Sequence, residues 1–296
     1  PADRVGLIMD AYALVKANQM MTPEALIKLL AGYKEEEDCV VWQGLADALG
    51  GLESVLSEDE AMYGLFCKFA KQLVLPLVDK VGWDAKEGDA HLTSILRGIM
   101  VSLLSTFCSD DEQVKAEANR RCEAFLENPE DATALPADIK SPVFKIYLKT
   151  GGEKEYDAIK GFYYKAKDNA ERKHVLNTLG QIKDPKLKLA TLDWTTSGEV
   201  KLQDFFYAMG SVGHSGKKGR EMSWQYFQDN HVRLSQMVAK ASPSLMDAVI
   251  VMCSGGFCSE AKAEEIQAFF KKHPFPKNER KIAQMTENMR ANGKFL

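Results

Sequence analysis

Hydrophobic residues recur along almost the whole chain at the three-and-four spacing of one face of an α-helix. A clear example is the face formed in residues 3–18 by Val5, Ile8, Met9, Tyr12 and Val15. The strict alternation of apolar and polar residues that is typical of β-strands is essentially absent. The pattern therefore predicts an all-α protein.

Helix start signals and short turns divide this pattern into segments. Thr22-Pro23 and the acidic run at 109–112 are typical of helix N-termini, and Pro76 predicts a kink or break in its helix. The residues around 90–107 are apolar nearly all round, which favours a central helix packed on two sides. The predicted helices span 3–18, 23–33, 38–56, 62–81, 90–107, about 112–127, 143–149, 153–167, 170–182, 185–194, 243–254, 259–272 and 278–292, besides those of the stretch 199–238.

Many helices of this length joined by short links describe an α-superhelical solenoid of antiparallel helix pairs, similar to HEAT or armadillo repeats. We expect a single domain over residues 1–296. Residues 128–142 contain three prolines and mark a possible seam between two lobes. Leu135 and Ile139 give this segment apolar anchors, so a flexible linker is not expected there.

The stretch 199–238 predicts a helix, a glycine-broken loop and a second helix. Its glycines are Gly210, Gly213, Gly216 and Gly219, and its second helix carries Trp224, Phe227, His231, Leu234 and Val238 on one stripe. A phosphate-binding loop is the alternative. It would need Ser or Thr where Lys218 stands and a strand where the preceding helix lies. The pattern favours a connection between two helices.

The same stretch resembles a known family. Gly219-Arg220, Ser223-Trp224, Phe227 and Asn230 are similar to the penultimate helical hairpin in the C-terminal domain of M1-family zinc aminopeptidases. The lead-in at 210–220 is most similar to the puromycin-sensitive branch, although His231 stands where that branch usually has tryptophan. Further similar blocks follow in the same order as in the family, at residues 3–17, 41–49, 150–166 and 268–292.

This resemblance implies a bowl-shaped, non-catalytic domain that covers the active site of an aminopeptidase and shapes its substrate chamber. Zinc in such enzymes is held by an H-E-x-x-H helix. The five histidines here are His91, His174, His214, His231 and His273, and no two lie within five residues of each other. We therefore expect no metal site, no catalytic residue and no cofactor in this chain. The zinc, the catalytic domain and the N-terminal domain are expected upstream, in the full-length hydrolase.

Under this resemblance the partners are peptide substrates and the enzyme's own catalytic domain. Trp224, Phe227 and Asn230 are expected to form the structural hairpin. Arginines on the two closing hairpins are candidates for cations that face the substrate chamber, with a solvated helix surface as the alternative for each. These candidates are Arg220, Arg233, Arg280 and Arg290.

Two departures from the branch of the family found in the endoplasmic reticulum bear on substrate recognition. That branch holds a peptide C-terminus with a tyrosine-lysine pair and an arginine. The matching places here read Leu52-Glu53 and Ser211. The departures favour a cytoplasmic enzyme of broad specificity.

Composition limits the remaining classes. The net charge is −4 and no long lysine-arginine run is present, which argues against nucleic-acid binding. No apolar run approaches the roughly 20 residues of a membrane span, and no signal peptide is evident at Pro1. The six cysteines form no C-x-x-C pair, which favours a reducing compartment. A free-standing HEAT-like interaction scaffold remains the alternative function, and the sequence upstream would distinguish the two.

Overall fold

A computed structural model describes residues 1–17, 20–131 and 133–294. The described residues form fifteen α-helices and one short 3-10 helix, and no strand occurs among them. The fold is therefore all-α, as the periodicity predicts. The elements are α1 Ala2–Lys16, α2 Pro23–Ala31, α3 Cys39–Leu56, α4 Glu60–Val81, α5 His91–Phe107, α6 Glu112–Glu127, α7 Ala137–Thr150, α8 Glu153–Lys165, α9 Asn169–Leu176, η1 Leu179–Gln181, α10 Pro185–Thr195, α11 Phe205–Gly213, α12 Lys217–Val238, α13 Pro243–Ser254, α14 Glu260–Lys272 and α15 Glu279–Gly293.

Side-chain caps fix many of the helix starts. Thr22 accepts a hydrogen bond from the amide of Ala25 and precedes a proline in the first turn. Asp38 and Asp111 each accept from two amides at the starts of α3 and α6. These contacts satisfy backbone donors that have no partner inside a helix, and they explain why the predicted starts lie close to the observed ones.

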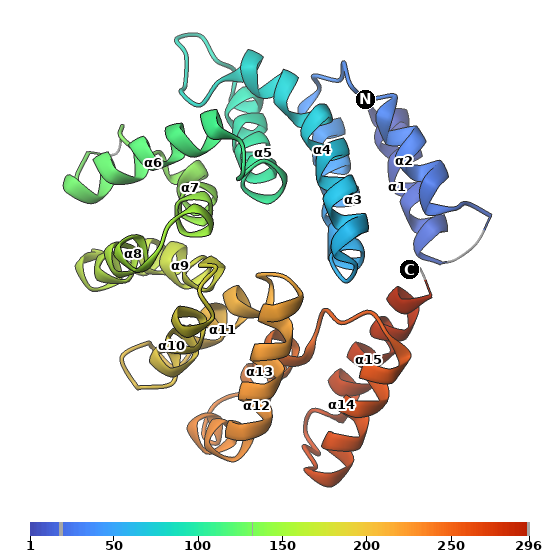
Figure 1. The fold of residues 1–296 in the computed structure, drawn as a ribbon, viewed down its shortest axis with the longest axis vertical. Coiled ribbons are helices and arrows are strands. Elements are labelled where there is room, and N and C mark those ends of the chain that lie inside the picture. The colour runs from blue at the N-terminus through green and yellow to red at the C-terminus, as the bar shows by residue number, and fades with distance from the viewer. Residues whose placement is uncertain (18–19, 132, 295–296) are drawn as a thin grey trace.

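Successive helices pair into two layers that follow an arc, so the structure is an α-solenoid (Figure 1). Helices α3, α5, α7, α11 and α13 lie nearer the middle of the arc. Helices α3, α5 and α7 contact in series, α9 and η1 connect α7 to α11, and α11 contacts α13. Helices α6, α8 and α10 lie outside them. We call the first set the inner wall. Its helices present their free faces toward the middle of the molecule.

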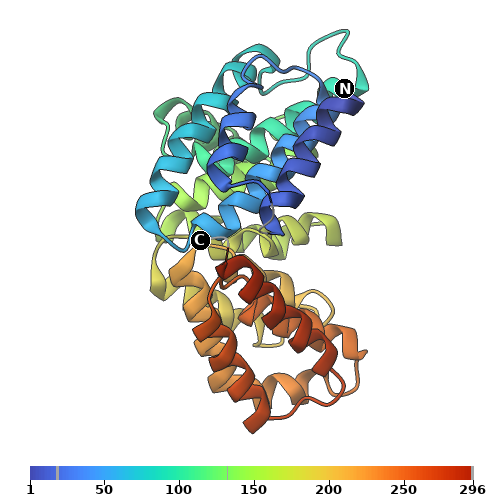
Figure 2. The same cartoon turned by 90° about the vertical axis from the view of Figure 1, so that its right-hand side faces the viewer.

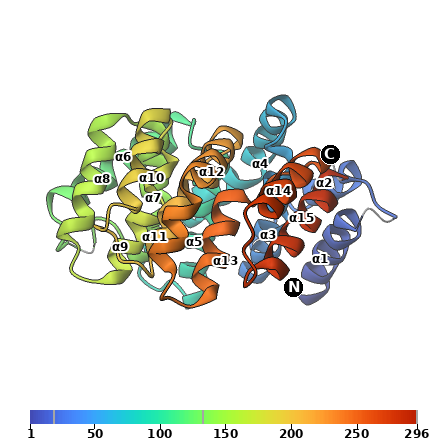
Figure 3. The same cartoon turned by 90° about the horizontal axis from the view of Figure 1, so that it is seen from below.

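The arc closes on itself. In Figure 2 the blue N-terminal helices and the red C-terminal helices α14 and α15 both face the viewer, one group above the other. In Figure 3 both groups lie at the right of the molecule. The start of α12 reaches the turn between α3 and α4, where Arg220 Nη2 lies 2.6 Å from Glu58 Oε1. Lys217 Nζ donates to the Glu58 carbonyl at 3.1 Å. Cys258 Sγ lies 3.8 Å from the Ser54 carbonyl oxygen.

The core is continuous across the segment that the sequence marks as a seam. Leu135 is 1% exposed and Ile139 is 2% exposed, and both belong to the main hydrophobic cluster. Helix α7 begins at Ala137, six residues before the predicted start. Pro142 lies inside α7, where the prediction placed it before the helix, and Pro76 lies inside α4. Neither proline ends its helix, so of the kink or break predicted at Pro76 the break does not occur, and the kink stays a prediction.

The expected glycine-broken loop is also wrong in extent. Only residues 214–216 separate α11 from α12, so Gly210 and Gly213 are helical and Gly219 lies in α12. A Cβ on Gly213 would lie 2.5 Å from the Met252 carbonyl oxygen. Gly216 alone of the four glycines has a positive φ, of 102°. The other three allow close packing instead of a turn.

Helix α4 meets the length and composition criteria for crossing a membrane, which the sequence analysis did not expect of any segment. A helix packed into a protein core meets the same criteria. Here α4 packs against α3 and α5 and buries Phe66, Leu73 and Val74.

Candidate functional site: the inner wall

Four basic side chains lie near one another, on the inner-wall helix α7, on α10 outside it and at the end of α11. Lys145 and Lys149 lie on α7, Lys188 on α10, and His214 directly after α11. The charges of Lys145 and Lys188 act on Lys149, and the charge of Lys145 acts on His214. We call Lys145, Lys149, Lys188 and His214 the inner cation cluster.

The lysines of the cluster bond to neutral oxygens. Lys145 Nζ donates to Thr106 Oγ1 at 3.2 Å and Lys149 Nζ to the Ser105 carbonyl at 3.1 Å. Lys188 Nζ donates to the Gly180 carbonyl at 2.8 Å. Within residues 1–17, 20–131 and 133–294, none of the three lysines forms an ion pair with a carboxylate. Glu53 is the carboxylate whose charge acts on Lys145 and Lys149, from beyond ion-pair distance.

The pKa of every member of the cluster is lowered, and burial is the largest cause in each case. Burial, followed by the charge of Lys145, lowers the pKa of Lys149 to about 7, with Glu53 opposing the shift. Burial lowers the pKa of Lys188 to about 8. Burial also lowers the pKa of Lys145, and burial together with Arg220 and Lys145 lowers that of His214. A bound anion would favour the protonated forms and reverse these shifts.

A small pocket of about 200 Å³ opens beside the cluster. Lys145 and His214 line it together with Gln181, which is 6% exposed. Gln181 Nε2 donates to the Ser211 carbonyl at 2.8 Å, while its Oε1 has no hydrogen-bond partner among the described residues. The pocket therefore offers positive charge and one buried acceptor to a ligand.

A larger groove of about 860 Å³ continues along α3 and α5. Its lining includes Gly50 and Gly98, which have no side chain to fill it, and the acidic residues Asp47 and Asp138. Thr106 lines this groove and also accepts from Lys145, so the groove and the cluster adjoin. The inner wall thus offers an acidic, partly apolar trough that leads to a basic end.

The family to which this scaffold belongs follows from comparison with known proteins. A family model described as the ERAP1-like C-terminal domain matches residues 1–291. The chain belongs to this family. Its helical solenoid with a polar inner wall is thereby the structure of an ERAP1-like C-terminal domain, and the resemblance to the C-terminal domain of M1-family aminopeptidases is confirmed at the family level.

The relatives of this ERAP1-like C-terminal domain are aminopeptidases. It is 28% identical over 296 residues to the alanine/arginine aminopeptidase of Saccharomyces cerevisiae, covering 99% of this chain and 34% of that protein. It is 27% identical to aminopeptidase M1-A of Oryza sativa subsp. japonica, covering 100% of this chain and 33% of the relative. Aminopeptidase M1 of Arabidopsis thaliana is also 27% identical, with 99% and 33% covered. The chain spans about a third of the length of these curated relatives.

The arginines predicted from the sequence of the domain are not gathered into one site. Arg220 is 6% exposed and pairs with Glu58, so a solvated surface position is wrong for it. Arg233 is exposed and donates to the Thr196 carbonyl at 2.5 Å. Arg280 is exposed at the start of α15. Arg290 lies near the end of α15 and pairs with Glu260 at 2.6 Å. A chamber-facing role for these arginines stays a prediction.

Two of the three hairpin residues of the domain, Trp224 and Phe227, lie in a group of aromatic rings within the hydrophobic core. Trp224 is 1% exposed, and its ring centroid lies 5.1 Å from that of Phe269. Its indole Nε1 donates to Glu265 Oε1 at 2.6 Å. Phe227 is fully buried, and Asn230 Nδ2 donates to the Tyr226 carbonyl within α12.

The lysines of the inner cation cluster were not predicted as site residues from the sequence. Lys145 and Lys149 are four residues apart, and the residues between them, 146–148, are all buried. A pair of lysines at helical spacing inside such an apolar stretch was the available signal. The pattern does not show which face of a helix lines the middle of a solenoid, so this signal could not be assigned.

The described residues contain no group of three or more His, Cys, Asp or Glu side chains placed to hold a metal ion. The six cysteines are free, and burial raises the pKa of Cys253 and Cys108, which suits inert core thiols.

Proposed function

We propose that this chain is the non-catalytic C-terminal domain of a zinc-dependent aminopeptidase that removes N-terminal residues from peptides. In this proposal the catalytic zinc belongs to the rest of the full-length enzyme, and the inner wall forms one side of the substrate chamber. The inner cation cluster then holds the C-terminal carboxylate of a peptide whose body lies in the groove along α3 and α5.

The observation that carries this proposal is the inner cation cluster itself. Three lysines with depressed pKa values and neutral oxygen partners cost stability, so their presence together favours an anionic ligand. A single carboxylate group is small enough to enter the pocket of about 200 Å³ that Lys145 and His214 of the cluster line. The alignment of this chain with the last third of several aminopeptidases supports the choice of a peptide.

The two departures noted in the sequence lie beside this cluster. Leu52 is buried, while the charge of Glu53 acts on Lys145 and Lys149. Ser211 is buried, and its hydroxyl accepts from the amide of Gly180. The lysines of α7 thus supply positive charge near the places where the branch of the endoplasmic reticulum has its own binding residues. We propose that they serve the same kind of ligand.

Peptide binding to the chain tests the proposal directly. A fluorescent decapeptide with a free C-terminus is expected to bind more tightly than the same peptide with an amidated C-terminus. The double variant Lys145→Met/Lys149→Met should lose about tenfold in affinity for the free acid and little for the amide, because two favourable charges are removed. Affinity for the free acid should fall as the pH rises through about 7, the pKa of Lys149, because the anion prefers the protonated lysine.

The control is Lys154→Met/Lys160→Met, which removes the same charge from α8 on the outer layer. Equal binding of the free acid and the amide would overturn the carboxylate site. In the full-length enzyme the α7 variant should raise KM for the free peptide and leave hydrolysis of an aminoacyl arylamide unchanged, since the short substrate does not reach the cluster.

A free-standing scaffold is the competing function, and extending the coding sequence upstream distinguishes it. An H-E-x-x-H segment there supports the aminopeptidase, whereas an unrelated domain contradicts it. We also propose a cytoplasmic location. The six free cysteines support a reducing compartment. One of the relatives, by contrast, is named a mitochondrial aminopeptidase.

A further inference from the structure

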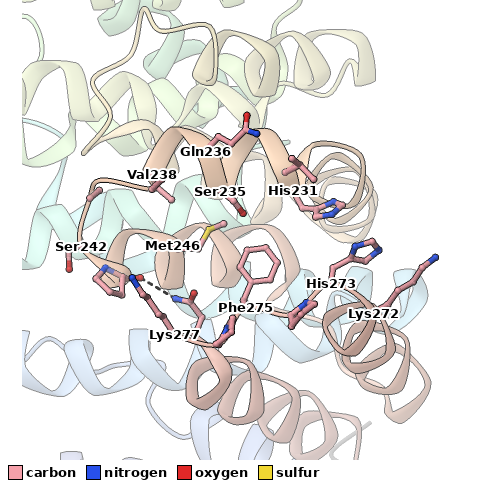
Figure 4. A pocket seen from close by; sticks show the side chains of 17 residues that line it. His231, Ser235, Gln236, Val238, Ser242, Met246, Lys272, His273, Phe275 and Lys277 are labelled. Carbon is pink, nitrogen blue, oxygen red and sulfur yellow. Dashed lines mark hydrogen bonds between the residues drawn. The ribbon is translucent and has the colours of Figure 1, made fainter.

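A second pocket lies away from the inner cation cluster, at the outer ends of α12 and α14. It has a volume of about 580 Å³ and is formed by the last half of α12, the turn into α13 and the connection from α14 to α15 (Figure 4). We call it the C-terminal groove. Its volume is typical of small-molecule sites.

The C-terminal groove has an apolar floor and a basic rim. Val238 and Met246 are 6% and 5% exposed, and Phe275 packs beside them. Lys272 and Lys277 are exposed, and with His231 and His273 they supply the ionisable groups of the lining. None of the described residues that line it is Asp or Glu.

Among the described residues, neither Lys272 nor Lys277 forms an ion pair with a carboxylate. Asp247 lies behind the wall and accepts from Asn278 Nδ2 at 2.8 Å. The rings of His231 and His273 lie 4.4 Å apart between their centroids. His231 Nδ1 donates to the Gln228 carbonyl, because a carbonyl can only accept, so its Nε2 is left for other partners. Burial and the charges of His231 and Lys272 lower the pKa of His273.

The groove is held open by rigid contacts. Pro274 and Pro276 fix the backbone on either side of Phe275. The Phe275 ring packs 5.5 Å from that of Phe270, in the aromatic cluster around Trp224. Asn278 Nδ2 donates to the Pro243 carbonyl at 3.2 Å and so joins the two walls. A preformed site loses little ordering entropy on binding.

We propose that the C-terminal groove binds an organic carboxylate with an apolar body, such as a medium-chain fatty acid. The acyl chain lies on Val238, Met246 and Phe275, and the carboxylate meets the basic rim at Lys272 and Lys277. This charge complementarity selects an acid over a neutral molecule of the same shape. The proposal does not depend on the function assigned to the inner wall.

The test uses octanoate and the 296-residue chain with ¹³C-labelled methionine methyl groups, where the Met246 signal is assigned by Met246→Leu. Octanoate is expected to shift this signal saturably at concentrations on the order of 10 mM or below. Octan-1-ol has the same chain without the charge and should bind about tenfold more weakly. The variant Lys272→Met/Lys277→Met should weaken octanoate binding by a similar factor.

Two further variants keep the result interpretable. Lys183→Met/Lys218→Met removes the same charge from exposed positions outside the groove and should leave binding unchanged. Ser235→Phe fills the α12 wall at a partly exposed position and should abolish binding with the fold retained. A Met246 signal that octanoate does not move, equal binding of octan-1-ol, or retained binding by Ser235→Phe would each overturn the proposal.

Discussion

At the scale of single residues, Lys149 carries a charge that burial disfavours. Its ammonium group is surrounded by protein and by two other lysines, and its pKa falls to about 7. An unfolded chain would leave this lysine with a pKa near 10.4. The unfolded state therefore binds more protons than the folded state between these values, and stability from this group rises with pH across that window.

The variant Lys149→Met should raise the melting temperature at pH 7. Methionine keeps the apolar stem and removes the charge that burial disfavours. The gain should be largest at and below pH 7 and should shrink as the pH rises toward 10.4, above which the wild-type lysine is mostly neutral in both states. Thermal unfolding followed by circular dichroism at several pH values measures it.

Lys154→Met is the matched control for this prediction. Lys154 is exposed in the first turn of α8, so its removal should leave the melting temperature nearly unchanged at every pH. A Lys149→Met variant less stable than the wild type at pH 7 would show that the charge of Lys149 stabilises the fold.

The burial of a side chain could be predicted from the sequence where the helical periodicity alone decides it. Trp224 and Phe227 fall on the apolar stripe of the sequence and lie in the core. Arg220 was not predictable in the same way, because its partner Glu58 is 162 residues away. Its burial depends on closure of the whole arc, which no local pattern contains.

At the scale of elements, glycines set how closely two helices can approach. A Cβ on Gly210 would lie 2.5 Å from Met252 Sδ, and one on Gly213 would lie 2.5 Å from the Met252 carbonyl oxygen. Helices α11 and α13 therefore pack backbone to backbone beside the inner wall. A thioether can rotate away, whereas a carbonyl cannot, so the two positions should tolerate a methyl group differently.

A series of glycine-to-alanine variants measures this packing. Gly213→Ala should destabilise by about 1–3 kcal/mol through overpacking, and Gly210→Ala should cost less. Gly161→Ala in α8 has nothing within 4 Å of the new Cβ and should stabilise by about 0.5–1 kcal/mol. Urea unfolding of the three variants gives the values. Equal effects at the three sites would contradict the close approach.

The order of elements was predictable, because caps and the three-and-four spacing are local signals. Most predicted helices lie within a few residues of the observed ones, as α3 and α5 show. The start of α7 and the end of α11 were wrong for one physical reason: tertiary packing holds proline and glycine inside helices when neighbours compensate for their intrinsic cost. Pro142 in α7 and Gly213 in α11 are such residues.

At the scale of the whole molecule, the closure of the arc rests on few contacts. Neighbouring helix pairs pack along the solenoid, but the start of α12 meets the turn between α3 and α4 mainly through side chains. The Arg220–Glu58 pair has side chains that are 7% and 15% exposed. Arg220 Nη2 donates to Ser57 Oγ at 3.2 Å, whereas Arg220 Nε and Glu58 Oε1 form no hydrogen bond among the described residues.

Breaking this pair should therefore open the molecule. Arg220→Ala leaves Glu58 buried without its counter-charge, which typically costs about 3–5 kcal/mol. The double variant Arg220→Met/Glu58→Met removes both charges and should recover most of that loss. Arg120→Ala breaks an exposed pair with Glu117 and should change stability by no more than about 0.5 kcal/mol.

Urea unfolding gives these energies, and small-angle X-ray scattering gives the radius of gyration. Because each helix pair still packs on its neighbours, Arg220→Ala should enlarge the radius at unchanged helicity. An Arg220→Ala variant as stable and as compact as the Arg120→Ala control would show that the arc closes without this pair.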